Sequence, residues 1–210
     1  MRHSVDVDDR YPSGRLRTPR GVREGGRAWQ QLHAELAWQG LVQLAERGYA
    51  GMAMDDVARA AGASVSSIYR HYPTKVDLAV AAIRQLPTFT GWLDGHDDPP
   101  ARIDRAATIG AAHHAYFVPV LANAIVFRNT VPELLETVVE HVMRPRQDAI
   151  TALIEQGQTR GEIRADIDPT VIAALAVGDL VDDCVGLRPL AAGAQRGRDA
   201  VERVWPLLHP

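Results

Sequence analysis

The chain has 210 residues, of which 46% are hydrophobic, with a formal net charge of −3 at pH 7 and one cysteine. This length and composition suit one small domain and one larger domain, each with a buried core. The single Cys184 excludes an internal disulfide and favours a cytoplasmic protein, and no apolar run approaches the roughly 20 residues of a membrane-spanning helix.

The charge is unevenly divided along the chain. Residues 1–78 carry 11 Lys and Arg against 9 Asp and Glu, a net charge of +2, whereas residues 79–210 carry 12 against 17, a net charge of −5. Positive charge is what a protein offers to a polyanion such as DNA. The N-terminal part is therefore the better candidate for binding nucleic acid.

Residues 1–27 are rich in Arg, Asp and Gly and show no apolar periodicity, so we expect them to be disordered. No apolar core follows the charged start, which argues against a signal peptide. Two interpretations stay open: a solvated tail or start-site artefact, and a basic arm that reaches an adjacent minor groove or the DNA backbone. The arm would use the recurring arginines Arg15, Arg17, Arg20, Arg23 and Arg27.

The next informative stretch predicts two short helices joined by a tight turn. Residues 55–61 form an amphipathic pattern, and Gly62 supplies the left-handed backbone that ends it. Ser64 is a natural N-cap for a second helix that runs to Tyr72, and Pro73 stops that helix. A helix, a turn and a second helix of this kind form a DNA-binding arrangement.

A capping box follows at once. Thr74 with Asp77 three residues later predicts the start of another helix directly after Pro73. The second helix is thus expected to be held rigidly between two junctions.

Two groups of residues around this motif follow a known pattern. Downstream, a Tyr-x-His-aromatic-x-x-Lys run is formed by Tyr69, His71, Tyr72 and Lys75. Upstream, first-helix core positions and a closing Gly-aromatic pair are occupied by Leu36, Leu41, Leu44 and Gly48-Tyr49. Over residues 33–83 the chain resembles the N-terminal domain of the tetracycline-repressor (TetR) family of bacterial transcriptional regulators.

The resemblance implies which residues face DNA. Lys75 would hold a phosphate, and the other DNA-facing residues would be Ser64, Val65, Ser66, Ser67, Tyr69, Arg70 and His71. Val65 departs from the usual polar or basic residue, and it can touch a thymine methyl group but cannot donate a hydrogen bond to guanine. Ala53 stands where Ser or Thr usually caps the preceding helix, and the acidic Asp55 and Asp56 would compensate only partly through the helix dipole.

From Thr74 onward the pattern is helical, and no strand is expected. The expected helices cover residues 74–86, 100–117, 119–129, 132–143, 145–160, 169–187 and 194–208. The sequence therefore predicts an all-α chain, with a three-helix helix-turn-helix domain at 28–78 and a larger helical domain at 79–210. The resemblance implies that the larger domain serves effector binding and dimerisation.

Residues 161–181 also resemble a C-terminal stretch of the TetR family, in which the last two helices of each subunit form a four-helix bundle with the partner. The expected dimer contacts are Val171, Ile172, Leu175, Val201, Val204 and Trp205, although the same stripe would also suit an intrachain core. A homodimer would present two recognition helices about 34–36 Å apart and would require a near-palindromic operator.

The middle of the larger domain combines apolar walls with isolated polar groups. The candidate ligand-binding residues are Trp92, His113, Tyr116, Phe117, Asn123, Phe127, Arg128 and His141. Such a mixture is typical of a pocket, and equally of an ordinary core with surface histidines. The resemblance implies a small-molecule effector, and these side chains favour a mostly apolar one.

We therefore expect a homodimeric DNA-binding regulator, a repressor by resemblance, that a ligand releases from its operator by moving the helix at residue 74. No cofactor or metal is expected, and the chain is not expected to be an enzyme, because adjacent His113 and His114 point about 100° apart on a helix. A helical module controlled by a protein partner is the alternative. A metal-dependent enzyme using Asp182, Asp183 and Cys184 is a remote one.

Overall fold

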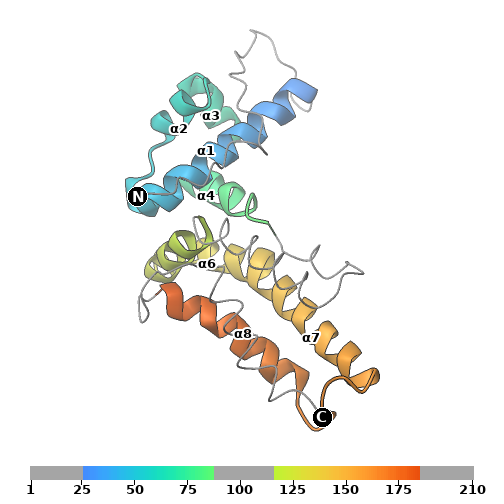
Figure 1. The fold of residues 1–210 in the computed structure, drawn as a ribbon. Helices are drawn as coiled ribbons and strands as arrows, with labels where there is room; N and C mark the ends of the chain where they lie inside the picture. The colour runs from blue at the N-terminus through green and yellow to red at the C-terminus, as the bar shows by residue number, and fades with distance from the viewer. Residues whose placement is uncertain (1–25, 88–115, 185–210) are drawn as a thin grey trace, which may run out of the picture. The chain divides into compact units, whose positions relative to one another are not determined.

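The computed structural model describes residues 26–87 and 116–184, apart from the side chains of residues 176, 177 and 179–184. The chain divides into two compact units, Met1–Ala82 and Ile83–Pro210. Every regular element in the described ranges is helical, as the sequence predicts (Figure 1). The expected helix at 194–208, most of that at 100–117, and the arm at 1–27 except its last two residues lie outside these ranges.

The first unit is built on α1 (Arg27–Gly51), whose apolar side chains recur at helical spacing. Leu36, Leu41 and Leu44 are each at most 1% exposed, which confirms their predicted place in the core. Gly48 breaks the helical backbone near its end with a φ of 70°. A residue with a Cβ would be strained there, which explains the glycine of the Gly-aromatic pair.

The helix-turn-helix comprises α2 (Met54–Ala60) and α3 (Val65–His71). Gly62 lies between them with a φ of 67°, the left-handed conformation expected for the turn. Helix α3 ends one residue before the predicted end, because Tyr72 is extended (φ −136°). The residue before a proline avoids helical backbone, and Pro73 follows.

Helix α4 (Lys75–Ile83) starts at the predicted capping box. The Thr74 N–H donates to Asp77 Oδ2 at 2.9 Å, and the Asp77 N–H donates to Thr74 Oγ1 at 3.1 Å. A Cβ added at Gly40 of α1 would lie 3.2 Å from Leu78 Cδ1, so α1 and α4 approach closely there. The first compact unit extends to Ala82 and so includes most of α4.

The second unit contains a helix over residues 116–127, then α6 (Pro132–Val138), the π-helical turn η2 (Val139–Met143), α7 (Arg144–Thr159) and α8 (Pro169–Cys184). Helices α7 and α8 pack against each other (Figure 1). Asp168 caps the start of α8, since its Oδ1 accepts the Thr170 N–H at 2.9 Å.

Two predicted helix breaks, before Pro119 and before Pro145, are absent. Pro119 is the fourth residue of the helix over residues 116–127. An α-helical N–H bonds the carbonyl four residues earlier, so the N–H that proline lacks would have no partner within this range. At Pro145 the preceding π turn matters, because the Arg144 N–H donates to the Val139 carbonyl five residues back. This wider turn accommodates a proline that would otherwise clash with the carbonyl four residues earlier.

Candidate nucleic-acid interface

Helix α3 presents an outward-facing surface made by two rows of side chains. Val65 and Tyr69 are one helical turn apart and are 45% and 48% exposed, and the exposed Ser66 and Arg70 form the neighbouring row. Ile68 is fully buried and anchors the opposite side of the helix. We call Val65, Ser66, Tyr69 and Arg70 the α3 outer face.

Ser64 and Ser67, two of the residues predicted to face DNA, are bonded to each other at the start of α3. Ser67 is buried, and its N–H donates to Ser64 Oγ at 3.2 Å, so the Ser64 side chain is the N-cap. The hydroxyl of Ser64 also lies 2.9 Å from that of Ser67 and 3.0 Å from that of Ser66. The Ser64 and Ser67 side chains therefore fix the start of α3, and the exposed Ser66 is the serine that belongs to the α3 outer face.

His71, at the end of α3, is 8% exposed and packs against the first turns of α1. Its ring stacks on Trp29 with centroids 3.6 Å apart and an interplanar angle of 22°, and its Nδ1 lies 3.4 Å from Nδ1 of His33. Burial, with smaller contributions from His33 and Arg70, lowers the pKa of His71 to about 4. The imidazole is therefore neutral at physiological pH.

Lys75 is held at the start of α4 by the end of α1. Its Nζ donates to the Ala50 carbonyl at 3.1 Å and lies 4.7 Å from the centroid of the Tyr49 ring. Partial burial lowers its pKa. These contacts fix the position of the ammonium group. The aromatic residue of the Gly48-Tyr49 pair therefore contacts the lysine of the Tyr-x-His-aromatic-x-x-Lys run.

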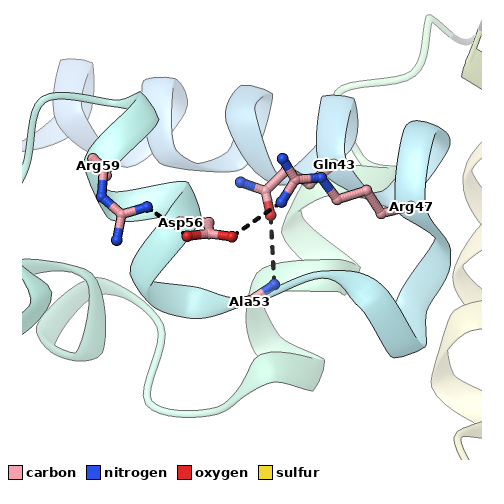
Figure 2. Close-up of polar contacts among 5 residues, drawn as sticks. All are labelled: Gln43, Arg47, Ala53, Asp56 and Arg59. Atoms are coloured by element: carbon pink, nitrogen blue, oxygen red, sulfur yellow. Dashed lines mark hydrogen bonds and ion pairs between the residues drawn. The ribbon is translucent and has the colours of Figure 1, made fainter.

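The start of α2 lacks a side-chain cap, as the alanine at position 53 predicts. The Ala53 N–H instead donates to Gln43 Oε1 of α1 at 3.4 Å (Figure 2). Asp56 forms ion pairs with Arg59 at 2.6 Å and Arg47 at 3.0 Å, and hydrogen bonds from Arg59 and then Arg47 lower its pKa. The negative charge of Asp56 is therefore balanced by two arginines.

Sequence reasoning missed the contributions of α1 to this surface. Trp29, His33, Gln43 and Arg47 all contact α2, α3 or the residues next to them. A signal was present, because Trp29 and His33 stand four residues apart and so share one face of a helix. Their partners are more than 35 positions away and are not identifiable from spacing.

The described ligand candidates are distributed over one helix and its neighbourhood. Phe117 is fully buried, and Tyr116 and Phe127 are half-buried on the same helix. Asn123 donates to the Pro119 carbonyl at 2.9 Å, and exposed Arg128 donates to the Ile125 carbonyl at 3.0 Å.

His141, on η2, lies with its Nε2 3.0 Å from the Leu86 carbonyl. Trp92 and His113 lie outside the described residues. Among the residues that are described, no group of three His, Cys, Asp or Glu is placed to hold a metal ion, and no helix is long and apolar enough to cross a membrane.

Helix α8 carries the described part of the predicted dimer contacts. Val171 and Leu175 are 53% and 67% exposed, and a Cβ at Gly178 would meet nothing within 4 Å. Ile172 instead packs on the small core of Ile154 and Ile163. Val201, Val204 and Trp205 lie outside the described residues.

Two family models match the chain in succession. Residues 39–82 match the model described as bacterial regulatory proteins of the tetR family, and residues 106–204 match the tetracyclin repressor-like C-terminal domain. The chain belongs to the TetR family. Its α1–α4 unit is accordingly a helix-turn-helix DNA-binding domain, and the protein is a DNA-binding transcriptional regulator.

Similar TetR-family and helix-turn-helix regulators span most of the chain. The transcriptional regulator AcuR of Cereibacter sphaeroides is 28% identical over 80% of this chain and 82% of its own length. An uncharacterized HTH-type transcriptional regulator of Mycobacterium bovis is 31% identical over 64% of this chain and 67% of its own. These names point to transcriptional regulators and not to enzymes.

Solved structures share the fold. A TetR-family regulator from Mesorhizobium loti superposes with a TM-score of 0.67 at 16% identity, over 86% of this chain and 98% of that one. A TetR regulator from Chloroflexus aurantiacus gives 0.65 at 24% identity, over 84% and 93%. The agreement extends over both units of the TetR-family architecture.

Proposed function

We propose that this TetR-family protein is a homodimeric repressor that binds a near-palindromic operator through the α3 outer face and Lys75. The observation that carries the proposal is the surface itself. A short capped helix, anchored by Ile68, presents Val65, Ser66, Tyr69 and Arg70 to solvent. A recognition helix reads DNA by placing such side chains in the major groove.

Three residues of the α3 outer face and Lys75 have chemical roles in this proposal. Val65 contacts a thymine methyl group, Ser66 bonds a base edge, and Tyr69 and Lys75 bind phosphates. Ser64, Ser67 and His71 act by holding α3 in place. Their bonds and stacking to neighbouring residues support this role over direct contact with bases.

Release by a small molecule is the second part of the proposal. The C-terminal model matched at 106–204 is the tetracyclin repressor-like domain, and the described ligand candidates supply buried or half-buried aromatic groups and more exposed polar groups in that unit. Ligand binding would move α4, which follows α3 after only a short turn at Pro73. DNA and ligand then weaken each other reciprocally, by typically about 1–3 kcal/mol.

The test is selection of purified protein against a random duplex pool, with a Tyr69→Ala/Lys75→Ala variant in parallel. Wild type should enrich a near-palindrome and the variant should not, because two phosphate contacts per subunit are lost. Loss of the Lys75 charge should also reduce the slope of log affinity against log salt by about 1 per subunit, whereas loss of the uncharged Tyr69 should weaken binding without changing that slope. The matched control is Arg160→Ala, which removes an exposed cation from the second unit.

Enrichment of the same near-palindrome by wild type and Arg160→Ala alone supports the proposal and provides the probe for ligand screening. Enrichment of no sequence by wild type at low salt would contradict it. Equal enrichment by the double variant would show that another surface reads DNA.

A further inference from the structure

Trp29, in the first turn of α1, contacts two consecutive residues of the recognition helix. Its ring stacks on His71 with centroids 3.6 Å apart, and the guanidinium carbon of Arg70 lies 5.9 Å from its centroid. An arginine at this distance from an indole is attracted by the ring, and Trp is the strongest of the aromatic partners. The first helix therefore reaches one residue of the α3 outer face.

The Trp29 ring is itself held by a small cluster of aromatic side chains. His71 is 8% exposed and lies against His33, with 3.4 Å between their Nδ1 atoms. His33 stacks on Tyr72 with centroids 4.5 Å apart, and the Tyr72 hydroxyl donates to the His33 carbonyl at 2.9 Å. Because these contacts join α1 to the end of α3 twice, the position of Trp29 relative to α3 is fixed.

Arg70 is exposed while it lies beside this ring. A guanidinium that is restrained in advance loses less conformational freedom when it forms two parallel hydrogen bonds. Guanine offers its N7 and O6 atoms to such a pair in the major groove, and this is the commonest base-specific arginine contact. Because the neighbouring His71 imidazole is neutral, it does not repel the Arg70 guanidinium.

We propose that Trp29 is a specificity-determining positioning residue, which holds Arg70 so that Arg70 reads a guanine in each operator half-site. The proposal rests on the DNA-binding function proposed above and adds the base and the residue that sets its recognition. Arg70 makes the contact, and Trp29 acts through it.

The experiment measures binding of the full-length protein to the selected operator and to operators with each base pair replaced in both half-sites. Wild type, Trp29→Phe, Trp29→Leu, Arg70→Ala and the Trp29→Leu/Arg70→Ala double variant are compared. Phe keeps an aromatic face, and Leu keeps an apolar side chain without one. A thermal melt of each variant tests whether the first unit is folded.

Arg70→Ala should reduce discrimination for one guanine about tenfold or more per half-site. Trp29→Leu should reduce discrimination at the same guanine by about two- to fivefold, and Trp29→Phe should restore most of it. In the double variant the loss should lie within about twofold of Arg70→Ala alone, because Trp29 has no Arg70 left to position. A merely structural role would weaken every operator equally.

Three outcomes overturn the proposal. Uniform weakening by Arg70→Ala on specific and random duplexes would make Arg70 a phosphate contact. A full additional loss in the double variant would make Trp29 independent of Arg70, and unchanged base preference in Trp29→Leu would remove its role in specificity. Each is distinguishable from failure of the proposed function, in which wild type selects no operator at all.

Discussion

The histidine at the end of α3 links the stability of the DNA-binding unit to pH. Burial is the main cause that lowers the pKa of His71 from 6.5 to about 4, and burial also lowers the pKa of His33. Between pH 4 and 6.5 the unfolded chain therefore binds more protons than the folded chain. The contribution of the neutral histidines to the free energy of unfolding is fully present above about pH 6.5, and it is lost as the pH falls toward 4.

We expect wild type to lose on the order of 1 kcal/mol between pH 7 and pH 5 through His71, a value reduced for partial solvent screening. The His71→Gln variant should be less stable than wild type at pH 7 and should lose less on acidification. Urea unfolding at both pH values, followed by circular dichroism, measures the difference. Parallel pH profiles for the two proteins would contradict the assignment.

The pH window separates this effect from that of the carboxylates. Hydrogen bonds from arginines lower the pKa of Asp56 and Asp166 below the usual value of 3.8. Their contribution to stability is present above that pH and is lost only at lower values. Acidification from pH 7 to pH 5 therefore tests the histidines alone among these shifted groups.

At the scale of a single helix, the start of α2 offers a stabilising substitution. Ala53 is exposed and extended (φ −121°, ψ 130°), which is the backbone of an N-cap, but its methyl group accepts no hydrogen bond. Ala53→Ser should supply an acceptor for an N–H in the first turn and stabilise the protein by about 1 kcal/mol.

The control for this substitution is Ala60→Ser, at the exposed other end of the same helix. It makes the same chemical change where no cap is needed, and it should be neutral or slightly destabilising because serine is a weaker helix former. Thermal unfolding of both variants gives the comparison. Equal shifts in Tm would show that α2 gains nothing from a cap.

The helices of the first unit were predictable because their ends depend on local chemistry. Gly62, Ser64 and the Thr74–Asp77 pair each act within four residues, and each occupies its predicted place. The gaps predicted between helices at residues 118 and 144 are absent, since the effect of the neighbouring prolines depends on the backbone around them. The contact of Trp29 with α3 joins residues about 40 positions apart, and no sequence pattern specifies it.

For the whole molecule, the proposed two-fold recognition of DNA requires a surface that joins two copies of the chain. Helix α8 offers one, since Val171 and Leu175 share a face one turn apart and are 53% and 67% exposed in the single chain. The open space at Gly178 would let a partner helix approach closely. Apolar side chains on such a stripe are stabilised by burial against their symmetry mates.

In the proposed homodimer, Leu175→Glu should therefore produce a monomer, because each copy would bury a charge in the two-fold interface. The control is Val126→Glu, which places the same charge at a side chain that is 73% exposed on the helix over residues 116–127. Light scattering after size-exclusion chromatography should give the mass of one chain for the first variant and of two for the second. Operator affinity should fall at least about tenfold in Leu175→Glu and not in Val126→Glu, because only the first variant separates the two recognition helices. A dimeric Leu175→Glu would place the two-fold interface elsewhere on the second unit.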